Sequence, residues 1–217
     1  MQIRNNLIRE AAHDLRFLLN RNYKKKGALA FVANKYLLSI DERNYLARCV
    51  FSGVKSSSRN SKLVTPSEID GNFVLVDGYN VLITAENICR KEFEYLILCD
   101  DGVIRDLNAV FGKYKFNDIT EIALNNILDL LKKYSPLKIE FYFDKQVSFS
   151  GKLANLTEKI MEFKGLNGRA ILSKNVDFEI IKIMKDENGI VATSDGIIID
   201  KVERIVDLPF YLLKEIK

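Results

Sequence analysis

The sequence predicts an α/β protein: a Rossmann-like, mostly parallel sheet flanked by helices and preceded by a small all-α helical module. Two observations predict the sheet. Beyond residue 70, apolar runs of strand length alternate with helical segments, as they do in parallel sheets. The first run, residues 73–76, lies between Gly71 and Gly78, as is typical of a buried strand. A third observation predicts the module, because residues 1–52 contain only helical periodicity.

Composition limits the class of protein. The 217 residues allow one medium domain with a small module, and 47% hydrophobic residues support a sizeable core. The net charge of +4 mildly favours a polyanionic partner. No apolar run reaches the ~20 residues that span a bilayer, and the N-terminus lacks the apolar core of a signal peptide. We therefore expect a cytoplasmic protein with no membrane partner.

Cysteine and histidine usage narrows the chemistry. Cys49, Cys89 and Cys99 are far apart in sequence and form no zinc pattern, which favours a reducing cytoplasm. The one histidine, His13, is distant in sequence from the candidate site described below and is expected on a helix surface. Chemistry that needs a histidine base is therefore not expected.

Three helices are expected in the module, over residues 4–20, 26–36 and 39–51. In the first, Ile8, Ala11 and Leu15 share one face. The third begins at Ser39 and has Glu42 three residues later, which is the pattern of a capping box.

The module has two interpretations. A basic turn over residues 20–26 joins the first two helices, and the three helices resemble a helix-turn-helix bundle. In that case Arg9, Arg43 and Arg48 would contact nucleic acid. Otherwise the module serves packing, or it serves dimerisation in a homodimer.

A polar, serine-rich segment with one proline follows over residues 53–70 and is interpreted as a linker. The expected domains are therefore the helical module over 1–52, the linker over 53–70 and the α/β domain over 71–217. The elements expected after the first strand are a helix over 80–89, a strand over 93–99 that opens a hairpin at 100–104, a capped helix over 118–133, a strand over 139–143, a helix over 152–163, a strand over 169–172, a helix over 175–184, a strand over 190–193, a short strand pair over 197–206 and a last helix from Pro209.

Aspartates end three of the predicted strands. Asp77, Asp144 and Asp195 each follow an apolar run, and Asp177 opens the helix before the last of these strands. The carboxyl ends of parallel strands meet at one sheet edge, where ligands bind. Clustered carboxylates repel one another unless a cation is present, and oxygen ligands suit Mg²⁺ or Mn²⁺. Such an ion activates water and stabilises charge on a phosphodiester. Taken singly, Asp77 could instead initiate a turn and Asp177 could cap a helix.

These residues resemble a known family. The segments VDGYN at 76–80, FD at 143–144, NVD at 175–177 and TSD at 193–195 are similar to motifs of the PIN/NYN-like nuclease superfamily, in the same order along residues 72–206. The whole chain also looks like uncharacterised prokaryotic proteins in which a helical domain of unknown function precedes a PIN-like half. The resemblance implies a ribonuclease that depends on Mg²⁺ or Mn²⁺, with Asp77, Asp144, Asp177 and Asp195 in the metal site. It implies that Asn80 orients the site. Asn80 and Ser194 are also candidate substrate-binding residues.

Some residues depart from the pattern or have two interpretations. Residues 100–115 have no counterpart in a minimal PIN domain, so Asp100, Asp101, Arg105 and Asp106 either line the same cleft or belong to a hairpin. Glu121 is either the superfamily's helix-borne acid or part of a capping box. Ser148 and Ser150 could hold a phosphate at a helix start or cap that helix.

Three functions remain open from the sequence. The leading hypothesis is a metal-dependent ribonuclease with a basic module that holds RNA. The alternatives are a non-catalytic RNA-binding scaffold of the same fold and a metal-dependent phosphohydrolase that acts on a small phosphate ester. The sequence does not distinguish RNA from DNA or endonuclease from exonuclease action. The absence of G-x-G-x-x-G and G-x-x-x-x-G-K-[ST] leaves dinucleotide and NTP sites without support.

Overall fold

The computed structural model describes residues 5–107 and 114–216, and the chain divides into two compact units. The first unit comprises Met1–Ser61 and Glu94–Asn108, and the second comprises Lys62–Phe93 and Ala109–Lys217. The predicted α/β class with an N-terminal helical region is confirmed. Within the described residues, no helix is both long and apolar enough to cross a membrane.

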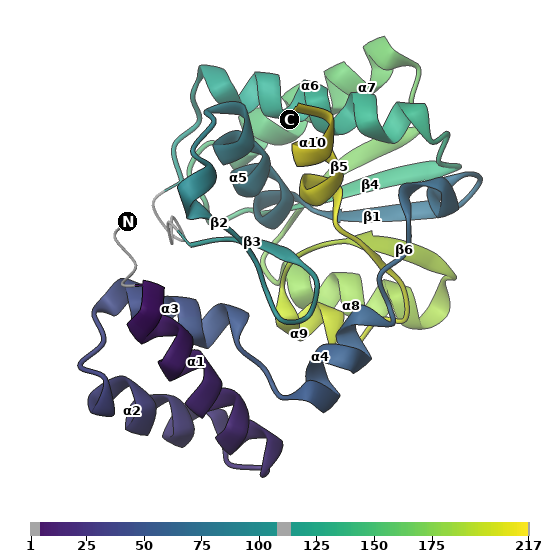
Figure 1. Ribbon diagram of the computed structural model, residues 1–217. Helices are drawn as coiled ribbons and strands as arrows, with labels where there is room; N and C mark the ends of the chain where they lie inside the picture. The colour runs from purple at the N-terminus through teal and green to yellow at the C-terminus, as the bar shows by residue number, and fades with distance from the viewer. Residues whose placement is uncertain (1–4, 108–113, 217) are drawn as a thin grey trace. The chain divides into compact units, whose positions relative to one another are not determined.

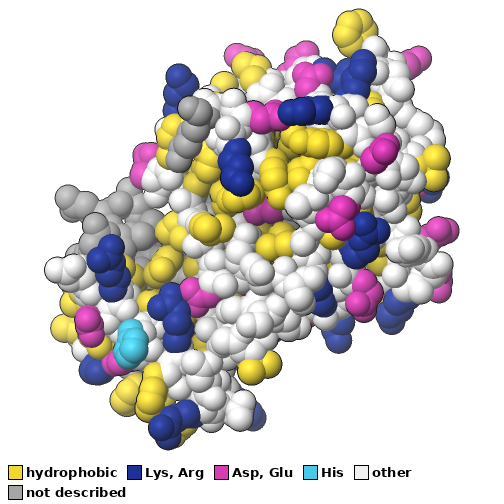
Figure 2. All heavy atoms as spheres, turned by 45° about the vertical axis from the view of Figure 1, so that its right-hand side comes forward, with side chains coloured by type: hydrophobic (Ala, Val, Ile, Leu, Met, Phe, Trp, Pro, Cys, Tyr) yellow, Lys and Arg dark blue, Asp and Glu magenta, His cyan; other side chains and the backbone are white. Residues whose placement is uncertain are grey.

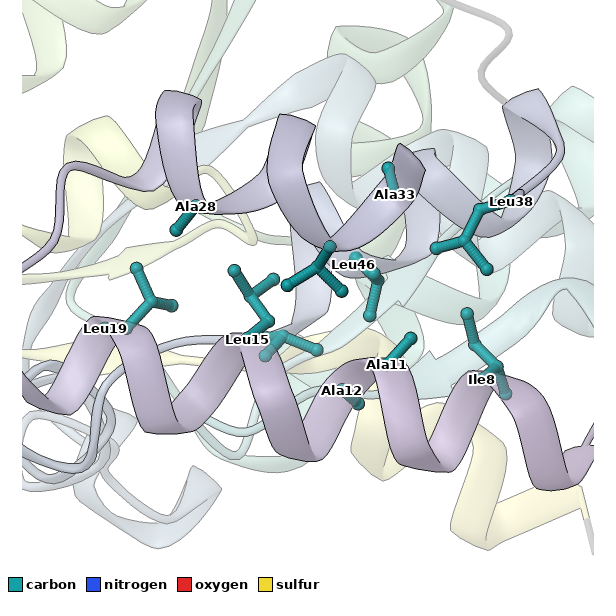
Figure 3. Close-up of a cluster of buried hydrophobic side chains, with 11 residues drawn as sticks. Ile8, Ala11, Ala12, Leu15, Leu19, Ala28, Ala33, Leu38 and Leu46 are labelled. Carbon is teal, nitrogen blue, oxygen red and sulfur yellow. The ribbon is translucent and has the colours of Figure 1, made fainter. Parts of the chain in front are cut away.

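The first unit contains the expected three helices, α1 (Asn5–Asn20), α2 (Lys25–Lys35) and α3 (Ile40–Cys49). Their apolar faces meet in one cluster (Figure 3). The predicted capping box is confirmed, because the Ser39 hydroxyl accepts from the Glu42 N–H at 3.3 Å and the Glu42 carboxylate accepts from the Ser39 N–H at 2.9 Å. The buried members of the cluster are Ile8, Ala11, Ala12, Leu15, Leu19, Ala28, Val32, Ala33, Leu38, Leu46 and Val50.

Part of the predicted linker is helical. Residues Gly53–Asn60 form α4, capped by Ser52, and Pro66–Ile69 form a 3₁₀ turn, η1. The polar sequence of α4 did not predict a buried helix face. Its buried side chain is Arg59, which pairs with Asp101 at 2.9 Å. A charged residue can be buried in this way only when its partner is supplied by another segment.

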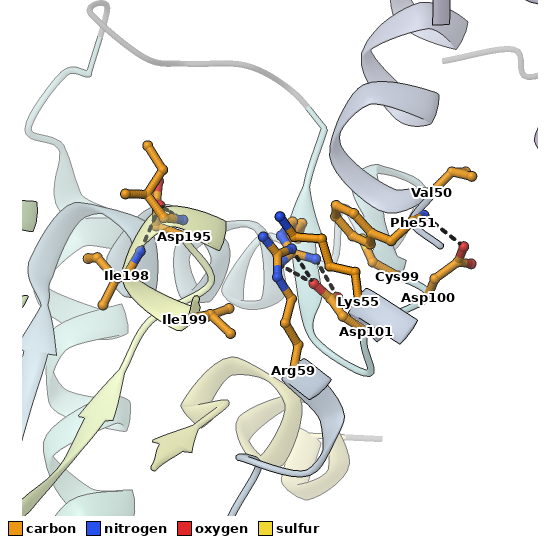
Figure 4. A network of polar contacts seen from close by, with 12 residues as sticks. Val50, Phe51, Lys55, Arg59, Cys99, Asp100, Asp101, Asp195, Ile198 and Ile199 are labelled. Carbon is orange, nitrogen blue, oxygen red and sulfur yellow. Dashed lines mark hydrogen bonds and ion pairs between the residues drawn. The ribbon is translucent and has the colours of Figure 1, made fainter. Parts of the chain in front are cut away.

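The predicted hairpin belongs to the first unit. After a 3₁₀ turn, η2 (Phe93–Tyr95), strands β2 (Leu96–Leu98) and β3 (Ile104–Asp106) pair antiparallel. Asp100 accepts a hydrogen bond from the Phe51 N–H, and Asp101 accepts one from Arg59 (Figure 4). Arg16 also donates to Asp100, and Arg105 also donates to Asp101. These acids thus join the hairpin to the helices of its own unit.

The second unit is built on a five-stranded sheet in the order β5-β4-β1-β6-β7, and every pairing is parallel. Helices α5, α6, α7 and α10 cover one face, and α8 and α9 lie on the other (Figure 1). Strands β1 and β6 are almost entirely buried, as their continuous apolar runs predict. The elements are β1 (Phe73–Asp77), α5 (Gly78–Cys89), α6 (Asp118–Lys133), β4 (Lys138–Asp144), α7 (Ser150–Lys164), β5 (Gly168–Ser173), α8 (Val176–Asp186), β6 (Gly189–Ala192), α9 (Gly196–Ile199), β7 (Ile205–Val206) and α10 (Leu208–Ile216).

Two expectations for this unit were wrong in detail. The strand pair expected over 197–206 is the short helix α9 followed by the two-residue strand β7, because the Asp195 carboxylate accepts from the N–H groups that start α9. The capping box of α6 is formed by Asn117 and Thr120, one residue earlier than a box that begins at residue 118 and includes Glu121. Nothing in the capping of α6 therefore requires Glu121.

Gly78 explains how α5 can begin directly after β1. A Cβ at this position would collide with the Phe143 ring and would lie 2.8 Å from the Tyr142 carbonyl oxygen. The first turn of α5 therefore lies against β4 only because residue 78 has no side chain. This close approach fixes Asn80 beside Asp77.

Candidate active site

Three neighbouring strands carry the predicted aspartates. Asp77 is the last residue of β1, Asp144 is the last residue of β4, and Asp195 follows β6 after two intervening residues. Because β4, β1 and β6 are adjacent and parallel, their carboxyl ends lie along one edge of the sheet. The predicted placement of Asp77 and Asp195 on the same edge is confirmed.

The order of the strands marks a ligand site. From β1 the chain builds β4 and β5 on one side, then crosses to build β6 and β7 on the other. In open α/β sheets the ligand crevice lies outside the carboxyl ends of the strands where the order reverses. Asp77 ends one of the two strands that meet at this reversal, and Asp195 follows the end of the other.

A cavity of about 670 Å³ opens at the same edge. It is lined by four of the residues predicted for the site, Asp77, Asn80, Asp144 and Asp177, and by the predicted phosphate ligand Ser148. The predicted residues Asp195, Ser150 and Ser194 are not among its described lining residues. The remaining lining residues are Tyr79, Ile83, Tyr114, Tyr142, Gln146, Val147, Lys174, Asn175, Val176 and Phe178.

Asp77 is the most tightly held of the carboxylates, with 3% of its surface exposed. Its Oδ2 accepts from Asn80 Nδ2 at 2.6 Å and from Thr193 Oγ1 at 2.8 Å. Thr193 Oγ1 in turn accepts from the Asp195 N–H at 3.0 Å. Among the described residues no donor reaches the other oxygen, Oδ1, so that oxygen can bind a ligand in the cavity.

Thr193 is a site residue that the sequence analysis did not identify. It lies within the TSD segment quoted for the resemblance, and its hydroxyl joins the end of β6 to the end of β1. The TSD segment at 193–195 was the sequence signal that could have identified Thr193, but only its serine and aspartate were predicted as site residues. Asn80 holds Asp77 as predicted.

The charges at this edge act on one another. Burial raises the pKa of Asp77 to about 7, and the charges of Asp195 and Asp177 add to the increase, while the bonds from Thr193 and Asn80 oppose it. Burial also raises the pKa of Asp177, with further contributions from Asp195 and Asp144. Four carboxylates are therefore close enough to disfavour one another's ionised forms, which a bound cation would reverse.

Asp195 and Asp144 each make local backbone contacts. Asp195 Oδ1 accepts from the N–H groups of Ile197 at 2.6 Å and Ile198 at 3.4 Å, and so caps α9 (Figure 4). Asp144 Oδ1 accepts from the Gln146 N–H at 2.8 Å. The capping role suggested for Asp177 is not observed, because Asn175 occupies the N-cap of α8 and Asp177 lies in its first turn.

The side chains at this edge limit how a metal ion could be bound. No group of three or more His, Cys, Asp or Glu side chains in the described part of the chain is arranged to hold an ion directly. Mg²⁺ usually keeps several waters and binds one or two carboxylates. An ion bound here would therefore use one or two of the carboxylates of Asp77, Asp144 and Asp177 that line the cavity, together with water.

The serines differ in their surroundings. Ser148 is exposed and lines the cavity. Ser150 is buried and donates to the Lys145 carbonyl at 3.4 Å, and the N-cap of α7 is Phe149. Neither serine therefore caps α7. Ser194 is also buried, with 8% of its surface exposed.

The residues predicted to bind nucleic acid in the first unit have mixed surroundings. Arg9 is exposed on α1, whereas Arg43 donates to the Leu38 carbonyl at 3.0 Å and to Asn34 at 3.2 Å. Lys25 donates to the Val50 carbonyl and lies over the Phe51 ring, and burial lowers its pKa to about 8. Arg48 is half-buried. On the face shown in Figure 2, basic side chains are interspersed with acidic ones.

The remaining residues that the sequence analysis singled out are not among the described residues that line the cavity. They include Asp100, Asp101, Arg105 and Asp106. Cys49 and Cys99, distant in sequence, pack in one small cluster of the first unit with Phe51 and Leu107. His13 is exposed on α1, as expected.

Comparison with known proteins places the chain in a family. The model of the domain of unknown function DUF5616 matches residues 66–211, and that of the protein of unknown function DUF434 matches residues 7–62. "Uncharacterized protein MJ0935" of Methanocaldococcus jannaschii is 37% identical over 203 residues, which cover 93% of this chain and 94% of that protein. No solved structure matches the chain. The chain therefore belongs to the DUF5616 family, in an arrangement in which a DUF434 region precedes the DUF5616 domain.

Proposed function

We propose that this protein is a Mg²⁺- or Mn²⁺-dependent ribonuclease of PIN/NYN-like type, whose active site is the cavity at the carboxyl ends of β1 and β4. One observation carries the proposal: Asp77, Asp144 and Asp177 line a single cavity beside the reversal of strand order, and the charge of Asp195 acts on two of them. Such an arrangement of acids lowers stability and is therefore characteristic of functional sites.

The charge balance of the cavity supports a cation. Among its described lining residues, Lys174 is the only cation and faces three aspartates. A phosphodiester is itself an anion, so these carboxylates would repel it unless a divalent ion lay between them. When bound, that ion supplies an activated water and neutralises charge on the phosphate.

The chain's own residues would prepare the site. Thr193 and Asn80 hold Asp77 through Oδ2, so that Oδ1 would be available to hold the ion. Asp144 and Asp177 approach from β4 and α8 and can accept the proton of the attacking water or a hydrogen bond from coordinated water. Lys174 would bind a neighbouring phosphate.

A second candidate is a metal-dependent phosphohydrolase that acts on a small phosphate ester. The size of the cavity favours it, because about 670 Å³ lies within the range of small-molecule sites. The same carboxylates and ion would serve either substrate, so the two candidates differ in the substrate alone.

Cleavage of a labelled twelve-residue oligoribonucleotide by the full chain tests the proposal, with Mn²⁺ binding measured separately. Asp77→Asn, Asp144→Asn and Asp177→Asn should each reduce cleavage by at least about 100-fold. Asp186→Asn is the matched control, since Asp186 is exposed at the opposite end of α8 from Asp177. Equal cleavage by all variants would overturn the proposal. Hydrolysis of a nucleoside monophosphate without cleavage of the oligonucleotide would favour the second candidate.

A further inference from the structure

The cavity has an aromatic wall as well as an acidic one. Tyr79 comes from α5, Tyr114 from the segment that precedes α6, Tyr142 from β4 and Phe178 from α8. The three tyrosines are largely buried, whereas Phe178 is 62% exposed. Phe178 therefore presents apolar surface to the cavity, and cavities that bind organic ligands are commonly lined by aromatic side chains.

Hydrogen bonds hold two of the tyrosines in place. The Tyr114 hydroxyl donates to Glu86 Oε1 at 2.7 Å, and the Tyr142 hydroxyl donates to Glu140 Oε2 at 3.0 Å. The Tyr79 and Tyr114 rings meet edge to face with centroids 5.1 Å apart. The rings of Tyr114 and Tyr142 are therefore fixed before a ligand arrives, which reduces the conformational entropy lost on binding.

Tyr79 differs from its neighbours. Its hydroxyl is buried and has no hydrogen-bond partner among the described residues. A buried polar group without a partner destabilises the folded state. A ligand that enters the cavity with a hydrogen-bond acceptor could supply the missing partner.

We propose that the aromatic wall accepts one nucleobase of a single-stranded nucleic acid, next to the phosphate held at the acidic wall. This inference rests on the proposed function and names its substrate as single-stranded. Stacking on aromatic rings suits a base that is free of a duplex. The Tyr79 hydroxyl donates to an acceptor on that base, and Lys174 contacts the adjoining phosphate.

The same geometry disfavours duplex substrates. A paired base is stacked within its helix and can reach a side-wall pocket only if it is extruded, which costs unpairing energy. The protein should therefore bind a single strand more tightly than the same sequence in a duplex.

The test measures binding of an eight-residue oligoribonucleotide that carries one 2-aminopurine, in the presence of Mg²⁺. The protein carries Asp77→Asn so that the strand stays intact. Adding Phe178→Ala should weaken binding about 5- to 150-fold, which is the range of base–aromatic stacking. Phe163→Ala is the matched control, because Phe163 on α7 is 90% exposed and is not among the described lining residues.

Tyr79→Phe provides a second test that does not depend on a change of shape. It should weaken oligonucleotide binding while leaving thermal stability unchanged or raised, because it removes an unpaired hydroxyl. Tyr211→Phe, on α10, is its control. The inference would be overturned if Phe178→Ala and Tyr79→Phe both left oligonucleotide binding unchanged. It would also be overturned if the duplex bound as tightly as the single strand of the same sequence.

The two proposals can fail separately. If the wild-type chain cleaves the oligonucleotide but the aromatic variants bind it normally, the nuclease proposal stands and the base site does not exist. If the wild type does not cleave it but the aromatic variants lose binding, the base site stands and the hydrolytic function is wrong.

Discussion

The hydroxyl of Thr193, just beyond β6, donates a hydrogen bond to Oδ2 of Asp77, at the end of β1, over 2.8 Å. The two residues are 116 positions apart in the chain and lie where the strand order reverses. Because Thr193 also accepts from the Asp195 N–H, one side chain links two of the predicted aspartates. This link occupies Oδ2 of Asp77, and no donor among the described residues reaches Oδ1.

Replacing Thr193 by valine should destabilise the protein more at pH 8 than at pH 5. Valine keeps the shape but removes the donor, and a hydrogen bond to an ionised carboxylate contributes about 1.5–3 kcal/mol, against about 1 kcal/mol for a neutral one. Urea unfolding in metal-free buffer at the two pH values measures the difference. Thr157→Val is the control, because Thr157 is buried on α7 and donates to the uncharged Leu153 carbonyl. An equal loss at both pH values in Thr193→Val would contradict the prediction.

Asp77 should make the metal-free protein less stable as the pH rises. Its pKa is raised from 3.8 to about 7 in the folded state, so the folded state binds the proton more tightly than the unfolded one. The stability from this proton is fully present below pH 3.8 and is lost as the pH rises through 7. This pKa difference of about three units sets an upper bound of about 4 kcal/mol on the loss of unfolding free energy.

Asp77→Asn should abolish most of that pH dependence. At pH 8 without metal, the variant should melt at or above the wild type, since it removes one buried charge. Mg²⁺ or Mn²⁺ should raise the melting temperature of the wild type and that of the variant much less. A variant that is markedly less stable without metal would show that Asp77 is a structural turn residue.

The sequence predicted the α/β class and the positions of four aspartates because both follow from short-range patterns. An apolar run of strand length is readable by itself, and a carboxylate at its end is placed at the sheet edge by the parallel topology. The orienting role of Asn80 was implied by the family resemblance, and its side chain donates to Asp77 three positions earlier in the chain.

The missed features depend on long-range pairing. Helix α4 was interpreted as a linker because its long buried side chain, Arg59, is charged and its partner Asp101 lies 42 positions further on. The role of Thr193 depends on β6 lying beside β1 in a particular register. The strand expected after Asp195 became α9 because that carboxylate binds the first N–H groups of the helix, and apolar residues 197–199 fit either state.

Gly78→Ala should disrupt the packing of α5 on β4. The added methyl group would collide with the Phe143 ring and approach the Tyr142 carbonyl oxygen, and such overpacking costs about 1–3 kcal/mol or more. Gly151→Ala in α7 is the control, because nothing lies within 4 Å of its Cβ position. That substitution should stabilise the protein by up to about 1 kcal/mol. Chemical denaturation of the two variants measures both effects, and equal stabilities would contradict the packing argument.

Asp101→Asn should strongly destabilise the first unit. Asp101 is fully buried and binds Arg59 at 2.9 Å and Arg105 at 2.6 Å. Removing its charge leaves two buried guanidinium groups without this carboxylate, a change that typically costs about 3–5 kcal/mol. Asp14→Asn is the control, because the Asp14–Lys35 pair is exposed and contributes about 1 kcal/mol or less. Hydrogen exchange of α4 and of the hairpin measures the effect within the unit, and equal protection in both variants would contradict it.

The last prediction concerns the helical module, for which nucleic-acid binding and packing or dimerisation are the competing interpretations. Arg9, Lys24 and Lys26 are exposed, whereas Lys25 is engaged with Val50 and Phe51. If the three exposed residues contact phosphates, replacing them by glutamine should reduce the slope of log affinity against log salt by about 2 for single-stranded RNA. Binding of long RNA at several salt concentrations measures this slope. Cleavage of an eight-residue substrate should persist, because its base and phosphate contacts lie in the second unit. Glutamine at Lys132, Lys185 and Lys201, which are exposed in the second unit, controls for net charge. If both triple variants behave alike toward RNA, the module serves packing or dimerisation, and sedimentation of the first variant would then be the decisive measurement.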